Sequence, residues 1–165
     1  MKLRPIFCNN WSFDICCGQT KSPIRSARGS YIQPKELFMD YPMIHICYRV
    51  MDLDASEKFY QDAFGFEVSR KKDYPEGKFT LSYLTAAGLP FELELTYNYD
   101  QKEPYVIGNG YSHLAVSVDN LEASHQRHTQ MGLELTPLKG LTQGQPSFYF
   151  VTDPDGFRIE VVRKK

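Results

Sequence analysis

The sequence predicts one α+β domain built from two copies of a βαβββ module, at about residues 43–98 and 111–163. Short runs alternate apolar and polar residues as half-buried strands do, and each half holds one stretch with helix start and stop signals. The second half also repeats the first. Because a βαβββ module cannot bury its sheet face alone, two modules side by side are expected to form a curved mixed sheet around a cleft.

The composition is that of an ordinary globular chain. Its 165 residues are 42% hydrophobic and 24% charged, and the net charge of −1 gives no reason to expect binding to nucleic acid or to an acidic membrane. No apolar run is long enough to span a bilayer. The cysteines do not form a disulfide framework, so we expect free thiols and a cytoplasmic location. They are Cys8, Cys16, Cys17 and Cys47.

Residues 1–42 differ from the rest, because they hold no sustained strand or helix period. They also lack the apolar stretch of a signal peptide. We interpret them as an N-terminal extension, disordered or preceding the native start, since Met39 or Met43 could each begin the chain. The domain is expected to occupy residues 43–165.

The first module begins with a strand at 43–50. Asp54, followed by Glu57, resembles a capping box, and Gly65 would end the helix that follows. The sequence Gly-Leu-Pro at 88–90 marks a break before the last strand. The three strands after the helix are expected at 66–71, 78–85 and 90–98.

The second module follows the same order, with a strand at 112–118. Its helix is expected to begin after Asp119 or Asn120 and to end before Gly132. A turn with the sequence Asp-Pro-Asp-Gly, residues 153–156, separates the last two strands. The remaining strands are expected at 133–138, 147–152 and 157–163.

Polar side chains gather on one face of the first module. His45, Cys47 and Arg49 alternate along the first strand, and Glu94 and Asn98 alternate along the last. Because successive side chains of a strand point to opposite faces, each set shares one face. The opposite faces are apolar and are expected to form the core.

The histidine and the glutamate both recur. His113 follows His45 by 68 residues, and Glu160 follows Glu94 by 66 residues. A single histidine or glutamate on a strand is ordinarily hydrogen-bonded or solvated, but recurrence at matching places in two modules favours a shared role. Two imidazoles and two carboxylates that converge in a cleft would hold a divalent metal ion.

The motifs MIHICYRV with LDASEKFY, FELELTYN, GYSHLAVSVDN and DPDGFRIEVV resemble the vicinal-oxygen-chelate superfamily and, more narrowly, the short bacterial glyoxalase I family, the lactoylglutathione lyases. The resemblance covers residues 43–163. It implies a glyoxalase/bleomycin-resistance-like fold and the isomerisation of the hemithioacetal of methylglyoxal and glutathione to S-lactoylglutathione. The metal ligands that it implies are His45, Glu94, His113 and Glu160.

The same resemblance implies the roles of individual residues. Glu160 would be the main base, with Glu94 as its counterpart on the other face of the substrate. Arg49 and Asn98 would hold the γ-glutamyl end of the thiol, and Lys139 would lie near the glycyl carboxylate. The metal would be nickel or cobalt, with zinc as a possibility.

The family also implies a homodimer whose sites are shared between chains, since the connection at 99–110 is short. Other superfamily functions stay open: an extradiol-type dioxygenase, a drug-binding resistance protein, or a fosfomycin-modifying transferase. These normally use fewer than four metal ligands, or none. Retention of a second carboxylate, Glu94, therefore favours the isomerase.

The remaining polar and aromatic features favour structural roles. We interpret Cys47 as a packing residue, and His125 and His128, three apart on the second helix, as a solvated helix face. The aromatic residues expected in the core are Phe59, Tyr60, Phe64, Phe148 and Phe150.

Overall fold

The chain divides into a unit of residues 1–42 and a unit of residues 43–165. Residues 1–42 were predicted to be an extension. Of these, residues 1–39 lie outside the described part of the structure. The structure, a computed structural model, describes residues 40–86, 88–142 and 144–164.

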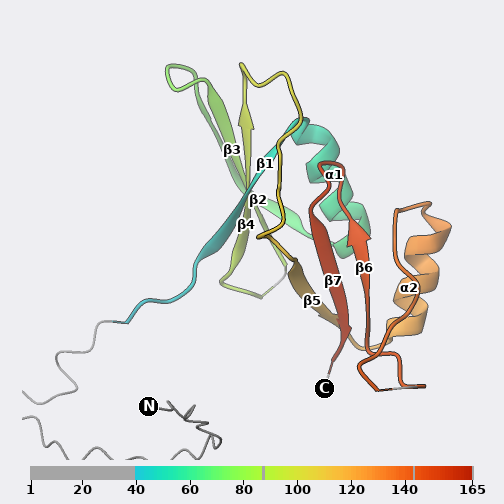
Figure 1. Cartoon of the computed structure of the whole chain (residues 1–165). Helices are drawn as coiled ribbons and strands as arrows, with labels where there is room; N and C mark the ends of the chain where they lie inside the picture. The colour runs from blue at the N-terminus through green and yellow to red at the C-terminus, as the bar shows by residue number, and fades with distance from the viewer. Residues whose placement is uncertain (1–39, 87, 143, 165) are drawn as a thin grey trace, which may run out of the picture. The chain divides into compact units, whose positions relative to one another are not determined.

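Within the described residues, seven strands and two helices follow one another in an order that repeats (Figure 1). The α+β class is therefore confirmed, with βαβββ in the first half and βαββ in the second. The elements are β1 (His45–Val50), α1 (Leu53–Phe64), β2 (Glu67–Tyr74), β3 (Phe79–Thr85), β4 (Glu92–Asn98), β5 (Leu114–Val118), α2 (Leu121–Gln130), β6 (Phe148–Thr152) and β7 (Arg158–Arg163).

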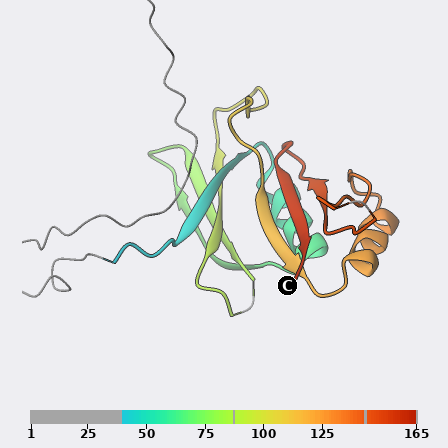
Figure 2. The same cartoon turned by 60° about the horizontal axis from the view of Figure 1, so that its bottom comes forward.

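The two modules pair their strands in the same way. The first sheet has the order β1-β4-β3-β2 and the second has the order β5-β7-β6. In each module the first strand runs parallel to the last, and the last strand is antiparallel to the one before it. One chain thus forms two sheets (Figure 2), and not the single curved sheet expected from modules placed side by side.

The strand predicted at 133–138 is wrong. The N–H of Thr136 donates to the carbonyl of Phe150 at 2.9 Å, and the N–H of Lys139 donates to the carbonyl of Phe148 at 2.8 Å. Between these bonds Pro137 has no N–H to donate, and the N–H of Phe150 bonds the Thr136 hydroxyl at 3.0 Å instead of a backbone carbonyl. The segment therefore runs beside β6 without forming a regular ladder.

Side-chain caps fix where the two helices begin. The Asp52 carboxylate accepts the N–H of Ala55 at 2.9 Å, so the predicted cap at Asp54 is wrong. Asp52 precedes that donor by three residues, which is the spacing that an N-cap needs. Gly65 ends α1 in the left-handed region, with φ 70°, and Asn120 caps α2, as predicted.

Helix α1 packs against both sheets and completes both cores. One buried cluster joins α1 to both modules and consists of Tyr48, Val50, Leu53, Tyr60, Leu84, Leu93, Leu95 and Ile159. Phe59 and Phe64 of α1 pack against a second cluster, which consists of Leu121, Tyr149, Val151 and Val161. Since these apolar faces meet at α1, the polar faces of both sheets turn away from it.

Hydrogen bonds also join the two modules. The hydroxyls of Tyr48 and Tyr111 lie 2.5 Å apart, and the Tyr60 hydroxyl donates to the buried carboxylate of Asp153 at 2.8 Å. The Met51 N–H donates to Asp155 at 2.8 Å. These contacts hold the second module against the α1 side of the first.

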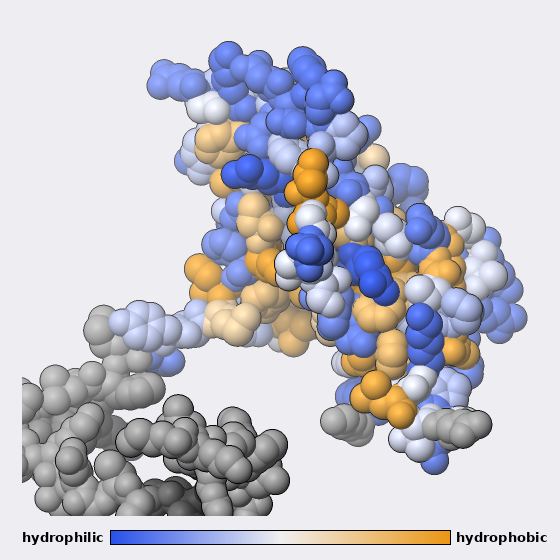
Figure 3. Space-filling view, in the orientation of Figure 1, coloured by the Kyte–Doolittle hydropathy of each residue, from blue (hydrophilic) through white to orange (hydrophobic). Residues whose placement is uncertain are grey.

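The outer surface is polar over the edge of the first sheet. Strand β2 is exposed along nearly its whole length, and Figure 3 shows hydrophilic residues at the tip of the β2–β3 hairpin. Among the described residues, no helix has the length and apolar character needed to cross a membrane.

Candidate metal centre

The first half-site consists of His45 on β1 and Glu94 on β4. Strand alternation places both on the face opposite the core, as predicted, because Tyr48 and Val50 are buried on the other face of β1. The Nε2 atom of His45 lies 3.4 Å from the Glu94 carboxylate. The sequence therefore brings one imidazole and one carboxylate together in this module.

The second half-site consists of His113, immediately before β5, and Glu160 on β7. His113 Nε2 lies 3.3 Å from the Glu160 carboxylate. The other ring nitrogen, Nδ1, lies 2.8 Å from the Ser112 hydroxyl. A bond from Nδ1 to that hydroxyl orients the ring and directs Nε2 toward Glu160.

The geometry of each half-site fits two ligands of one metal ion. Donor atoms about 2.1 Å from an ion and at right angles to one another are roughly 3 Å apart. The separations of 3.4 and 3.3 Å between imidazole nitrogen and carboxylate oxygen are close to this value. Nitrogen and oxygen donors of this kind suit a divalent metal ion.

Three side chains surround the Glu94 carboxylate. The Thr96 hydroxyl donates to it at 3.2 Å, and Cys47 and Tyr83 lie opposite Glu94 in the strand register. Burial opposes ionisation, but the neighbouring polar groups of Tyr83, Cys47 and Thr96, together with the charge of His45, hold the pKa of Glu94 below its usual value. Glu94 is therefore held as a carboxylate.

The two half-sites do not combine within one chain. Among the described residues, no cluster of three or more His, Cys, Asp or Glu side chains could hold a metal ion. The reason lies in the packing: both sheets turn their apolar faces to α1, so the two half-sites lie on faces that turn away from it. Each half-site presents two of the four expected ligands.

The expected substrate-binding residues lie on these same faces. Arg49 is exposed two residues after Cys47 on β1, and the Asn98 amide donates to the Tyr105 hydroxyl at 2.8 Å. Lys139 lines a cavity of about 710 Å³ together with Glu160. Phe148 and Phe150 line that cavity as well, so their expected place in the core is wrong, whereas Phe59, Tyr60 and Phe64 pack in the cores as predicted.

The structure also corrects the roles expected for Cys47 and the helical histidines. Cys47 is exposed on the half-site face and lies 3.2 Å from the Thr96 hydroxyl, so it is not a packing residue. His128 is only 1% exposed and bonds the Ala63 carbonyl at 2.9 Å. His125 contacts the Thr136 carbonyl at 3.0 Å, so neither histidine belongs to a solvated face.

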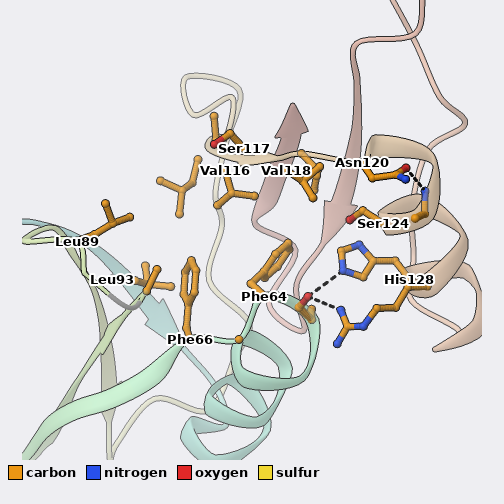
Figure 4. Close-up of a pocket in the computed structure, with 18 of the residues that line it drawn as sticks. Phe64, Phe66, Leu89, Leu93, Val116, Ser117, Val118, Asn120, Ser124 and His128 are labelled. Carbon is orange, nitrogen blue, oxygen red and sulfur yellow. Dashed lines mark hydrogen bonds between the residues drawn. The ribbon is translucent and has the colours of Figure 1, made fainter. Parts of the chain in front are cut away.

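A cavity of about 820 Å³ lies away from both half-sites (Figure 4). It opens between the end of α1, strand β5 and helix α2. His128 and Arg127 border it but are both bonded to the Ala63 carbonyl. Its wall is mainly apolar and includes Phe64, Phe66, Leu89, Leu93, Val116 and Val118.

Tyr83 is a site residue that sequence reasoning missed. It lies on β3 directly opposite Glu94 in the antiparallel pairing. Alternation along residues 79–85 puts Tyr83 on the half-site face, but its partner depends on the register between β3 and β4. That register is set by the connection between the strands, which the residue pattern of β3 does not reveal.

Comparison with known proteins agrees with this geometry. A lactoylglutathione lyase of Neisseria meningitidis is 39% identical over 126 residues, which cover 74% of this chain and 91% of that protein. One of Haemophilus influenzae is 38% identical over 133 residues, covering 74% and 93%. The solved glyoxalase I of Leishmania major, described as trypanothione-dependent, has a TM-score of 0.67 at 34% identity and covers 75% of this chain and 87% of that one.

The family model of the glyoxalase/bleomycin resistance protein/dioxygenase superfamily matches residues 43–161. The matched region includes both half-sites and all but the last two residues of the second module. With two relatives above one third identity over nearly their whole length, the chain belongs to the glyoxalase/bleomycin resistance protein/dioxygenase superfamily.

Proposed function

We propose that this chain is a lactoylglutathione lyase, which isomerises the hemithioacetal of methylglyoxal and glutathione to S-lactoylglutathione and thereby detoxifies methylglyoxal. The observation that carries the proposal is the imidazole–carboxylate pair repeated in both modules, at 3.4 and 3.3 Å. The family assignment and the names of its relatives point to the same activity.

The reaction moves one proton between neighbouring carbons of the substrate. Glu160 takes the proton from C1 of the hemithioacetal and returns it to C2, and Glu94 lies on the opposite side of the substrate. A divalent ion, when bound by His45, Glu94, His113 and Glu160, supplies the positive charge that stabilises oxyanions developing on the substrate. No oxidant is needed, because the product is an isomer of the substrate.

Charged and amide groups at the edges of the half-sites suit a thiol with carboxylate ends. Arg49 offers a guanidinium that can hold a carboxylate through two parallel bonds, and Asn98 offers an amide nearby on β4. Lys139 contributes a cation in the cavity that contains Glu160. We assign Arg49 and Asn98 to the γ-glutamyl end and Lys139 to the glycyl end.

Each complete site is proposed to need two chains. The first half-site of one protomer would meet the second half-site of its partner, so that a homodimer holds two sites. The absence of a three-ligand cluster among the described residues of one chain supports this assembly. The metal is proposed to be nickel or cobalt rather than zinc, and the location is proposed to be the cytoplasm.

A mixing experiment tests the shared sites. His45→Ala and Glu160→Ala are each expected to be inactive as homodimers. A mixed dimer then has one doubly damaged site and one intact site, so random assortment restores about a quarter of the wild-type activity. No recovery, with mixed dimers shown by mass spectrometry, would mean that each site belongs to one chain.

The activity is tested by reconstitution. Metal-free protein is loaded with Ni²⁺, Co²⁺ or Zn²⁺, and the thioester formed from methylglyoxal and glutathione is followed by ultraviolet absorbance. Thioester formation that depends on the ion, greatest with Ni²⁺ or Co²⁺, is expected. Tight metal binding without any thioester, together with oxygen uptake on catechols, would instead identify an extradiol-type dioxygenase.

A further inference from the structure

Helix α1 belongs to the first module, but its own segment satisfies only part of its C-terminal end. The last carbonyls of an α-helix lack intrahelical donors and need partners from elsewhere. The two residues that follow α1 donate their backbone N–H groups to the carbonyls of Tyr60 and Gln61, at 3.2 and 2.9 Å. The next two carbonyls along the helix are those of Asp62 and Ala63.

The donors for these two carbonyls come from α2, in the second module. The Arg127 guanidinium donates to the carbonyl of Asp62 and, at 2.8 Å, to that of Ala63. The Nε2 atom of His128 lies 2.9 Å from the Ala63 carbonyl, so this nitrogen carries the proton and donates (Figure 4). The His128 ring is buried, and its Nδ1 atom lies 2.9 Å from the Tyr149 hydroxyl. Two neighbouring residues of α2 thus complete the end of α1.

The second module also holds the start of α1. The Asp155 carboxylate, in the turn between β6 and β7, accepts the Met51 N–H at 2.8 Å and the Ser56 hydroxyl at 3.2 Å. Met51 follows β1 directly, and Ser56 lies in the first turn of α1. A helix carries partial positive charge at its N-terminus and partial negative charge at its C-terminus. The second module therefore places a carboxylate and a guanidinium at the ends that favour them.

Helix α2, in contrast, is completed within its own module. Its N-cap, Asn120, accepts the Ala123 N–H at 2.9 Å. At its other end, the carbonyls of Arg127 and His128 accept the N–H groups of residues 131 and 133, at 3.0 and 3.2 Å. The hydrogen bonds at helix ends therefore join the modules through α1 and not through α2.

We infer that Asp155, Arg127 and His128 are positioning residues that hold α1 at both ends and thereby set the orientation of the first half-site relative to the second. We call these three residues the α1 clasp. The inference rests on the proposed function, in which each metal ion needs one half-site of each kind.

The α1 clasp lies close to the strands that carry the ligands. Met51 directly follows β1, which carries His45, and Asp155 directly precedes the segment that enters β7, which carries Glu160. Each half-site lies within one sheet, so its internal spacing of 3.4 or 3.3 Å does not depend on the clasp. The spacing between half-sites does. In a two-fold symmetric dimer, rotating one module against the other displaces the halves of both sites equally.

Ni²⁺ affinity tests the α1 clasp without turnover. Asp155→Ala removes the acceptor at the start of α1, and His128→Leu removes a donor at its end. Competition with a chelating indicator is expected to show Ni²⁺ binding weakened by about 10-fold or more, as for other groups that hold metal ligands in place. Arg127→Met removes both bonds of an exposed side chain and is expected to act in the same direction without changing the core. Circular dichroism of the same samples checks that they are folded.

Conservative variants separate the hydrogen bonds from simple packing. His128→Gln keeps an N–H where Nε2 lies, and Asp155→Asn keeps an oxygen for the Met51 N–H. Both are expected to retain the Ni²⁺ affinity of the wild type. With Ni²⁺ saturating, kcat should fall by about 10-fold or more in His128→Leu and Asp155→Ala, because a displacement of about 1 Å is enough for such a loss. The conservative pair should recover it.

Asn120→Ala is the matched control, because it removes a helix-end bond inside one module. It is expected to destabilise the fold while leaving Ni²⁺ affinity unchanged. Wild-type Ni²⁺ affinity in Asp155→Ala, Arg127→Met and His128→Leu would overturn the inference, and so would equal weakening in Asn120→Ala. A wild type that neither binds Ni²⁺ nor forms thioester would instead refute the proposed function.

Discussion

The two modules have the same strand pairing but differ in how they use their surfaces. Toward α1 both present large apolar side chains, such as Leu95 in the first module and Ile159 and Val161 in the second. Away from α1, Thr96 donates to the glutamate of the first module at 3.2 Å, whereas the residues that lie opposite Glu160 in the second module are Ala115 and Phe150.

The guanidinium over each aromatic ring shows the same contrast. Arg70, over Tyr83, comes from β2 and also bonds Glu92, whereas Arg158, over Phe150, comes from β7 itself. An equivalent arrangement is thus built from non-equivalent positions. The two modules are thus alike where they pack in the core, whereas on the outer face the same ligand types have different neighbours.

The largest difference between the modules is expected from exchanging each glutamate for glutamine. Glu160→Gln should lower kcat by about 10²-fold or more with the metal still bound, because an amide cannot take the proton. Glu94→Gln should instead reduce Ni²⁺ affinity first. Thioester assays beside metal analysis decide this, and a Glu160→Gln enzyme with wild-type kcat would place the base elsewhere.

The contact between the modules is expected to depend on pH through Asp153. Burial raises the pKa of this carboxyl to about 6, although it accepts the Tyr60 hydroxyl and two backbone N–H groups. The folded state therefore binds a proton that the unfolded chain releases. Proton binding at Asp153 therefore adds to the free energy of unfolding. This stabilisation is fully present below about pH 4, is lost as the pH rises through 6, and amounts to about 3 kcal/mol at most.

Asp153→Asn tests this pH dependence. One oxygen of Asp153 accepts both backbone N–H groups, so the amide oxygen of asparagine can keep those bonds, and its NH₂ can donate to Tyr60. The free energy of unfolding of the wild type, measured with denaturant, should decline between pH 4 and 7. That of Asp153→Asn should not decline over this range. An unchanged slope would show that other groups titrate there.

Arg49 has no counterpart in the second module, because the corresponding residue there is Ser117. Arg49→Ala should raise KM for the thiol adduct by about tenfold or more, since a charge-assisted bond is worth about 1.5–3 kcal/mol. Metal content should stay the same, because Arg49 is not a ligand. Lost metal with unchanged KM would contradict the assignment.

The smallest effects are expected at the helix caps, which the modules share. Asp52→Ala and Asn120→Ala should each lower the free energy of unfolding by about 1 kcal/mol, since each removes an acceptor for a helix N–H. Asp54→Ala is the control and should change it by about 0.5 kcal/mol or less. Denaturant unfolding of the three variants makes the comparison. If Asp54→Ala lowered the free energy of unfolding more than Asp52→Ala, Asp54 and not Asp52 would be the N-cap.

Local pattern predicted which side chains of β1 share a polar face, because strand alternation requires only neighbouring residues. His45 with Glu94, and His113 with Glu160, were placed on polar faces and are found 3.4 and 3.3 Å apart. The glycine that ends α1 was equally readable from the sequence, since a left-handed residue there favours glycine.

The order of helices and strands and the residue types on each strand face could be predicted from local patterns, because these depend on periods of two and 3.6 residues. Only the tertiary structure decided that His128 is buried, that Pro137 interrupts the predicted strand, and that Tyr83 faces Glu94. It also decided that the half-sites turn away from the shared α1. Such features depend on contacts between segments far apart in the chain, and the pattern within one segment does not specify its partner.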